Sequence, residues 1–157
     1  MDISKSKSYV VGMMLDPNSY HTLFIETPRG SFVKWNEVGS IDFISPLPSP
    51  FHYGHVVGFQ GGDGDPLDAL YIGKLRTRTM KSCVVGVVRF VDNDQQDDKW
   101  IFSDGKLSQH HNWLIYGFFS VYALCKNLVA KTKGRANLSY IQSIEFWDDA
   151  SHPNSRR

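Results

Sequence analysis

Residues 82–91 read Ser-Cys-Val-Val-Gly-Val-Val-Arg-Phe-Val and carry the strongest β-strand signal in the chain. Valine dominates the stretch, and β-branched side chains favour extended backbone. Apolar residues fall on both faces of the expected strand, which is typical of a strand covered on both sides. The sequence therefore predicts a central strand here, around which the fold is built.

Further short β-prone segments flank this strand. Residues 22–27 and 31–35 are separated by the turn sequence Pro28-Arg29-Gly30 and predict a hairpin. Residues 100–102 follow an acidic turn at 92–99 and predict a second hairpin, with the strand at 82–91 as its partner. The other strand candidates are Val10 to Met14, 41–44, 51–59, 69–72 and 139–147.

One helix is expected, between about Gln109 and Leu128. Apolar residues recur in it at spacings of three and four and predict the stripe that packs on the sheet. The members of this stripe are Leu114, Phe118, Val121, Cys125 and Leu128. Many short strands with one helix favour a small β-barrel with a helix packed on it, as a single domain over residues 1–157.

The composition excludes several classes of protein. An apolar fraction of 41%, a charged fraction of 21% and a net charge of +1 fit a soluble globular domain and give no global electrostatic case for binding nucleic acid or an anionic membrane. No apolar run is expected to approach the length of a membrane span, and the first residues lack the apolar core of a signal peptide. Cys83 and Cys125 lie in apolar surroundings and predict buried thiols, hence a cytoplasmic protein.

The chemistry is expected at the turn Gly61-Gly62-Asp63-Gly64-Asp65-Pro66-Leu67-Asp68, which places three carboxylates within six residues. Like charges this close repel each other unless a cation lies among them, and hard divalent cations prefer carboxylate oxygens. A solvated turn is the alternative, because Asp, Gly and Pro are common turn residues.

The second acidic turn favours a site over a surface turn. Asp92 and Asp97 flank it, and Lys99 follows on the same face of an extended chain as Asp97. Two such turns at strand ends can meet at one rim of a barrel, with Asp94 and Asp98 as solvated neighbours. Carboxylates that bind metals, beside lysines that bind anionic oxygens, suit transfer of a phosphoryl group to water.

Seven segments resemble the soluble family I inorganic pyrophosphatases, in the same order along the chain. They are residues 25–35, 51–54, 62–70, 85–92, 96–101, 118–122 and 144–150, of which Asp63-Gly64-Asp65-Pro66-Leu67-Asp68 matches the acidic signature of the family. The resemblance runs from about residue 22 to 150 and implies an α+β, mainly β fold: an OB-like five-stranded β-barrel with helices packed outside. It implies Mg²⁺-dependent hydrolysis of inorganic pyrophosphate, with Mn²⁺ or Zn²⁺ as other possible ions. The implied partners are this substrate and further copies of the chain, without nucleic acid or membrane.

The resemblance also assigns roles to individual positions. The residues implied to hold metal are Glu26, Asp63, Asp68, Asp92 and Asp97. Asp65 would accept a proton from the attacking water, and Lys34, Tyr53, Lys99 and Tyr122 would hold phosphate oxygens, with Tyr53 and Lys99 also counted as catalytic. By themselves, Tyr122 would be a core aromatic and Lys34 a solvated side chain.

Four active-site positions depart from the family pattern, and three of them thin its phosphate clamp. Asn36 stands for a glutamate, Phe43 for an arginine, Ser49 for a tyrosine and Ala123 for a lysine. Glu37 follows Asn36, but a shift of one residue along a strand is expected to turn it to the other face. Basic residues elsewhere are candidates for compensation: Arg29, Arg76, Arg78, Lys126 and Lys131. These departures leave open a different phosphoanhydride or organic phosphate as substrate, and a weakly active or non-catalytic barrel that binds metal or phosphate.

Overall fold

The computed structural model describes residues 15–44, 47–61, 64–136 and 138–147 of the chain. The expected strand from Val10 to Met14 lies outside these residues. The elements are β1 (Tyr20–Thr27), β2 (Val33–Trp35), β3 (Ile41–Ile44), β4 (His52–Gln60), β5 (Pro66–Ile72), β6 (Thr79–Asp92), β7 (Gln95–Gln96), β8 (Lys99–Ser103), α1 (Gln109–Thr132) and β9 (Tyr140–Phe146).

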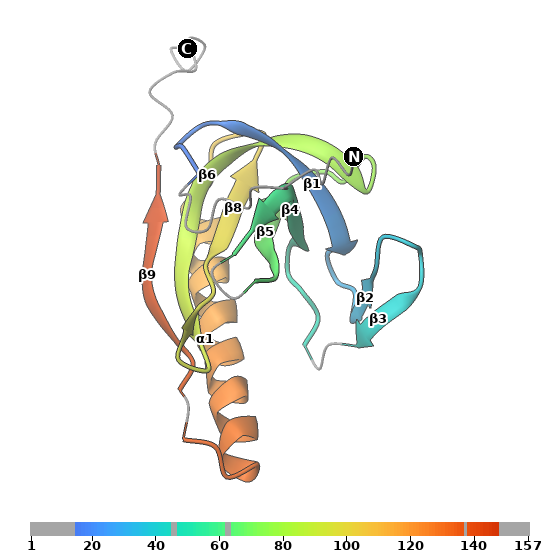
Figure 1. Cartoon of the computed structure of the whole chain (residues 1–157). Helices are drawn as coiled ribbons and strands as arrows, with labels where there is room; N and C mark the ends of the chain where they lie inside the picture. Colours follow the sequence, from blue (N-terminus) through green and yellow to red (C-terminus); the bar gives the residue numbers. More distant parts are fainter. Residues whose placement is uncertain (1–14, 45–46, 62–63, 137, 148–157) are drawn as a thin grey trace, which may run out of the picture.

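Five strands close into a small barrel in the order β1-β4-β5-β8-β6, and β6 returns to pair with β1 (Figure 1). Only the β5–β8 pair among these is parallel, with Asp68 opposite Lys99. The long β6 also pairs with β7 and β9, so the predicted central strand is confirmed. The expected mainly β fold with a closed five-stranded barrel is confirmed as well.

Two apolar clusters occupy the two sides of the barrel wall, because successive residues of a strand face opposite sides. On β8, Trp100 and Phe102 belong to one cluster and Ile101 to the other. On β5, Tyr71 and Leu70 divide in the same way. The first cluster fills the barrel, and the second joins the barrel to α1. Both faces of β5 and β8 are therefore apolar because each face packs in one of the two clusters.

The predicted hairpin of residues 22–35 is wrong. β1 pairs with β4 and β6, whereas β2 pairs with β3 in a separate two-stranded ribbon that stands beside the barrel (Figure 1). Gly30 has a φ of 79°, and its N–H bonds to the carbonyl of Ser49 at 2.7 Å. The connection is therefore held by the loop before β4 and does not fold β2 back onto β1.

The predicted helix is confirmed, but its buried stripe is wrong by about one position. Ser108 caps the first turn of the helix together with His111. The helix buries Ile115, Phe119 and Ala123 against the barrel, whereas Val121 and Leu128 are exposed. Apolar residues occur all round this helix, so periodicity alone did not identify the face that packs.

By length and composition, α1 is also long and apolar enough to cross a membrane, so the expectation that no apolar run reaches this length is wrong. A single such helix is weak evidence for a membrane span, because helices that pack on a protein core pass the same test.

Candidate functional site

A cavity of 610 Å³ lies where the barrel, the β2 strand and α1 meet. Most elements of the barrel contribute side chains to it. Its lining consists of Glu26, Thr27, Lys34, Leu47, Ser49, Tyr53, His55, Asp65, Pro66, Asp68, Asp97, Lys99, Phe118, Phe119, Tyr122 and Lys126. Charged groups from distant parts of the sequence are thereby gathered around one pocket.

Lys99 joins the two acidic turns. Its Nζ contacts Asp68 Oδ2 on β5 and lies 2.6 Å from Asp97 Oδ2 in the turn before β8. The parallel register of β5 and β8 places Asp68 beside Lys99, and the spacing of two places Asp97 on the same face. The predicted meeting of the two turns at one rim is therefore confirmed for these residues.

Burial makes this ion cluster tightly coupled. Lys99 is only 3% exposed. Burial alone would lower the pKa of Lys99, but its coupling to Tyr53 and the carboxylates of Asp68 and Asp97 raise that pKa well above its usual range. Burial and the nearby charge of Asp68 raise the pKa of Tyr53 well above its ordinary value. The pocket thus contains a fixed ammonium and a neutral phenol, both suited to anionic oxygens.

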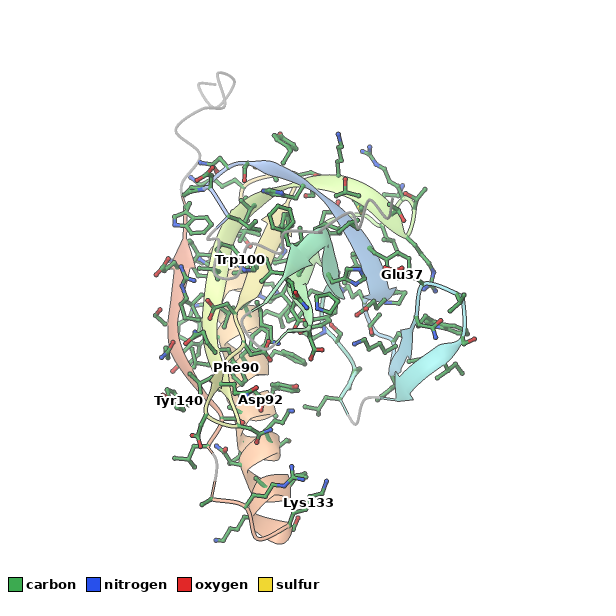
Figure 2. All side chains as sticks on the ribbon, in the orientation of Figure 1. Glu37, Phe90, Asp92, Trp100, Lys133 and Tyr140 are labelled. Atoms are coloured by element: carbon green, nitrogen blue, oxygen red, sulfur yellow. The ribbon has the colours of Figure 1, made fainter. Side chains whose placement is uncertain are left out.

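Glu26, at the other wall, contacts two basic side chains. Its Oε2 lies 3.4 Å from Nζ of Lys34, and its Oε1 lies 3.0 Å from Nδ1 of His55. His55 Nε2 in turn lies 3.1 Å from Oε1 of Glu37, which projects from the loop after β2 (Figure 2). The hydrogen bond to Glu26 and the charges of both glutamates raise the pKa of His55, although burial opposes this.

The contacts of His55 with Glu26 and Glu37 were not predicted from the sequence. The argument against Glu37 assumed that a strand continues through it, but β2 ends at Trp35 and Glu37 lies in a turn. In a turn, the side-chain alternation of a strand no longer applies. The only available signal was that His55 shares the face of Tyr53, two residues earlier on β4.

Asp92 has a different environment from the other expected metal ligands. It lies at the end of β6 beside α1 (Figure 2), where its Oδ2 is 2.8 Å from Nζ of Lys126 and its Oδ1 accepts a 2.8 Å hydrogen bond from Ser139. Burial would raise the pKa of Asp92, but the bonds from Lys126 and Ser139 outweigh this effect and lower it. Asp92 does not line the cavity, whereas Lys126 does.

The structure thus brings most of the expected site residues to one place. Those that line the cavity are Glu26, Lys34, Tyr53, Asp65, Asp68, Asp97, Lys99 and Tyr122. Asp92 reaches it through Lys126, and Asp63 lies outside the described residues. Among the five candidates for compensation, Lys126 alone lines the cavity.

Three of the four departures from the family pattern make structural contacts. Asn36 closes the β2–β3 turn, because its Oδ1 accepts a 2.9 Å hydrogen bond from the N–H of Ser40. Ser49 lines the cavity and donates to the carbonyl of Phe51. Ala123 is buried in the cluster between α1 and the barrel. Phe43 lies in β3, and its side chain is outside the description.

Asp94 and Asp98, the two residues expected to be solvated neighbours of the site, have different environments. Asp94 is exposed, as predicted. Asp98 is not merely solvated, because its Oδ2 pairs with Nη1 of Arg89 at 2.7 Å and both side chains are largely buried. The guanidinium of Arg89 also lies 5.4 Å from the ring centroid of Trp100. Asp98 therefore stabilises the β6–β8 hairpin.

The donor set fits a hard divalent cation in its chemistry. Asp68 and Asp97 already converge on one ammonium group, and carboxylate oxygens are the ligands that such ions prefer. Within the described residues, no three His, Cys, Asp or Glu side chains are yet placed to hold a metal together. Asp68 and Asp97 are the residues best placed to begin such a site.

The rim of this small β-barrel combines carboxylates, which hard cations prefer, with lysines, which bind anionic oxygens. This defines a site of the class that can bind phosphate groups together with metal. Comparison with known proteins agrees, because the model of the inorganic pyrophosphatase family matches residues 23–137. The chain belongs to the inorganic pyrophosphatase family.

Individual relatives support this assignment. The inorganic pyrophosphatase of Corynebacterium glutamicum is 34% identical over 85 residues, which are 48% of this chain and 54% of that protein. The chain therefore spans about half the length of the curated relatives that it matches. Among solved structures, the inorganic pyrophosphatase of Neisseria gonorrhoeae has a TM-score of 0.60 at 25% identity. The match covers 80% of this chain and 81% of that chain. The inorganic pyrophosphatase of Thermus thermophilus has a TM-score of 0.62 at 21% identity, and the match covers 89% of this chain and 88% of that chain. This match shows that the two proteins share a fold.

Proposed function

We propose that this chain hydrolyses inorganic pyrophosphate to two orthophosphates in the cavity at the barrel rim. The observation that carries the proposal is the contact of Lys99 with both Asp68 and Asp97, because it joins the two acidic turns beside the cavity. Membership of the inorganic pyrophosphatase family supports the same reaction.

The chemistry assigns separate tasks to the lining residues. Asp65 accepts a proton from a water molecule while the water oxygen bonds to one phosphorus. The bond from that phosphorus to the bridging oxygen then breaks, and the second phosphate leaves with the electron pair. Lys99 and Tyr53, together with Lys34 and Tyr122, hold phosphate oxygens and stabilise the charge that develops on them.

Mg²⁺ is the proposed ion, with Mn²⁺ or Zn²⁺ as alternatives. When bound, it would lower the pKa of the attacking water and neutralise substrate charge. Glu26, Asp68 and Asp97 would hold it within the cavity, and Asp63 and Asp92 are the further ligands that the family resemblance implies. For Mg²⁺ to bind at Asp68 and Asp97, Lys99 has to share these carboxylates with the ion.

Release of phosphate from pyrophosphate in the presence of Mg²⁺ tests the proposal. Asp65→Asn keeps the shape of the side chain and removes the proton acceptor, so the rate is expected to fall about 100-fold or more. Asp94→Asn is the matched control, because Asp94 is exposed and does not line the cavity. A wild-type rate no higher than that of Asp65→Asn would contradict the proposed reaction.

A second substrate class is favoured by the lining and volume of the cavity. Leu47, Phe118 and Phe119 form an apolar part of its lining, and its volume of 610 Å³ is in the range of pockets for organic ligands. A phosphoanhydride with an organic group would use this wall. Initial rates with a panel of nucleotides and sugar phosphates decide between the two, and inorganic pyrophosphate as the best substrate excludes the second.

We further propose a cytoplasmic protein that acts as a homo-oligomer and uses neither nucleic acid nor a membrane. Cys83 and Cys125, which are free thiols, and the net charge of +1 support these expectations.

A further inference from the structure

Lys126 is the candidate for compensation that lines the cavity, and its contacts specify the role that it can take. It lies one helical turn after Tyr122, and residues four apart on a helix share a face. Its Nζ lies 5.6 Å from the ring centroid of Tyr122, and both side chains line the cavity. The side chain of Lys126 is 35% exposed, so its ammonium can reach a ligand from the cavity side.

The position of Lys126 is fixed by a short chain of contacts that starts in the protein interior. Ser139, which is 2% exposed, donates to Oδ1 of Asp92, and Asp92 Oδ2 accepts from Lys126. Asn127, the next residue of α1, holds Ser139 from both sides, since its side chain accepts from the N–H of Ser139 at 2.7 Å and donates to its carbonyl at 2.8 Å. The carboxylate that orients Lys126 is therefore itself immobilised.

Each oxygen of Asp92 accepts one hydrogen bond from a protein partner, and Asp92 does not line the cavity. Through Lys126, Asp92 presents a cation to the cavity. Its geometry is that of a positioning residue for Lys126.

We propose that Lys126 binds a phosphate oxygen of the substrate and that Asp92 positions it for this contact. The inference rests on the proposed function and specifies one of its residues. Lys126 would then serve as a third cation of the cavity beside Lys34 and Lys99. It requires no movement of the helix, because the ammonium already faces the residues expected to hold phosphate.

Binding of methylenediphosphonate, in which a methylene group replaces the bridging oxygen, is measured by calorimetry in excess Mg²⁺. Lys126→Met keeps the length of the side chain and its helix propensity, and it is expected to weaken binding about 10-fold or more because a charge-assisted contact is lost. Lys126→Arg should restore most of the affinity. Lys131→Met is the matched control in the last turn of the same helix, outside the cavity lining, and should bind as the wild type does.

Asp92→Asn separates a positioning role from a metal role. It should weaken binding in the wild-type background and have little further effect in Lys126→Met, because the two residues act as a pair. Equal affinities of wild type and Lys126→Met would overturn the inference and leave the proposed function standing. A further loss of 10-fold or more from Asp92→Asn in Lys126→Met would overturn the positioning role. No binding of the analogue by the wild type would overturn both the inference and the proposed function.

Discussion

At the scale of the residue, Tyr71 illustrates how a buried polar group is satisfied away from the cavity. It is 1% exposed, and its hydroxyl donates to Oδ2 of Asp104 at 2.7 Å. The other oxygen of Asp104 accepts from Ser82 at 2.9 Å. These bonds join β5 and β6 through the residue that follows β8.

Tyr71→Phe is expected to lower the free energy of unfolding at pH 7 by about 1 kcal/mol, the usual net value of one hydrogen bond. Burial and the bond to Asp104 raise the pKa of Tyr71 from 10.0 to about 12, so the folded protein holds this proton more tightly than the unfolded chain does. The contribution is therefore complete below pH 10 and is lost as the pH rises toward 12. Urea unfolding at pH 7 and pH 11 should show a smaller difference between wild type and variant at the higher pH.

Tyr20→Phe is the control for this measurement, because Tyr20 is 62% exposed. It should unfold as the wild type does at both pH values. An unchanged difference between wild type and Tyr71→Phe from pH 7 to pH 11 would contradict the raised pKa.

Asp68 permits a test of metal binding that does not depend on turnover. An ion that binds only the folded protein stabilises it, by about 2.7 kcal/mol at a concentration 100 times its Kd. We expect Mg²⁺ to raise the melting temperature of the wild type and to raise that of Asp68→Asn much less. Asp94→Asn, outside the cavity, should respond as the wild type does, and equal shifts in Asp68→Asn and wild type would refute a metal role for Asp68.

At the scale of the element, Gly54 shows why β1 and β4 pair so closely next to the cavity. A Cβ at this position would lie 1.8 Å from the carbonyl oxygen of Phe24, which is backbone and cannot move aside alone. Tyr53 and His55, which line the cavity, flank this glycine on β4. The close approach of the two strands therefore also fixes two residues of the site.

Gly54→Ala is expected to lower the free energy of unfolding by about 3 kcal/mol or more, because the two strands have to separate. Gly105→Ala is the control, since no atom lies within 4 Å of a Cβ at that position. It should change stability by no more than about 0.5 kcal/mol. Similar melting temperatures for the two variants would contradict the close β1–β4 contact.

The strands could be predicted from the sequence more completely than their partners. The apolar run of β6 and the alternation of β9 depend on local patterning, which identifies an element and its faces. The partner of β1 is not decided by local patterning. Pro28-Arg29-Gly30 is suitable for a hairpin, but the N–H of Gly30 bonds to the backbone carbonyl of the distant Ser49. Pairing is decided by contacts between segments far apart in the chain.

The same distinction applies to the site. Asp68, Asp97 and Lys99 could be placed together because each lies in a recognisable turn or at a strand end. Lys99 contacts Asp68 through strand register and Asp97 through a spacing of two residues. The contacts of His55 with Glu26 and Glu37 could not be predicted from the sequence, because they depend on how the β2–β3 ribbon stands beside the barrel. The roles of the residues stay predictions until the variants are measured.

At the scale of the whole molecule, the outer face of α1 exposes several large apolar side chains. Trp113, Val121, Leu124 and Leu128, here called the outer stripe, are 72%, 48%, 58% and 55% exposed. They recur at helical spacings on the side of α1 turned away from Ile115 and Phe119. A large exposed apolar patch of this kind marks an interaction surface more often than open solvent.

A second copy of the chain is the partner that we expect for the outer stripe, since a two-fold axis brings identical patches together. Helix α1 contains no acidic residue, so an added carboxylate would be placed against apolar side chains of the partner helix. Light scattering during gel filtration should give the wild type the mass of two or more chains, each of 17.9 kDa. Leu124→Glu should shift it toward the single-chain mass because a charge is costly to bury in such an interface. Lys133→Glu, at the C-terminal cap of α1 and exposed on the side opposite Leu124, adds the same side chain and should retain the wild-type mass. A wild type at the single-chain mass would contradict the expected assembly.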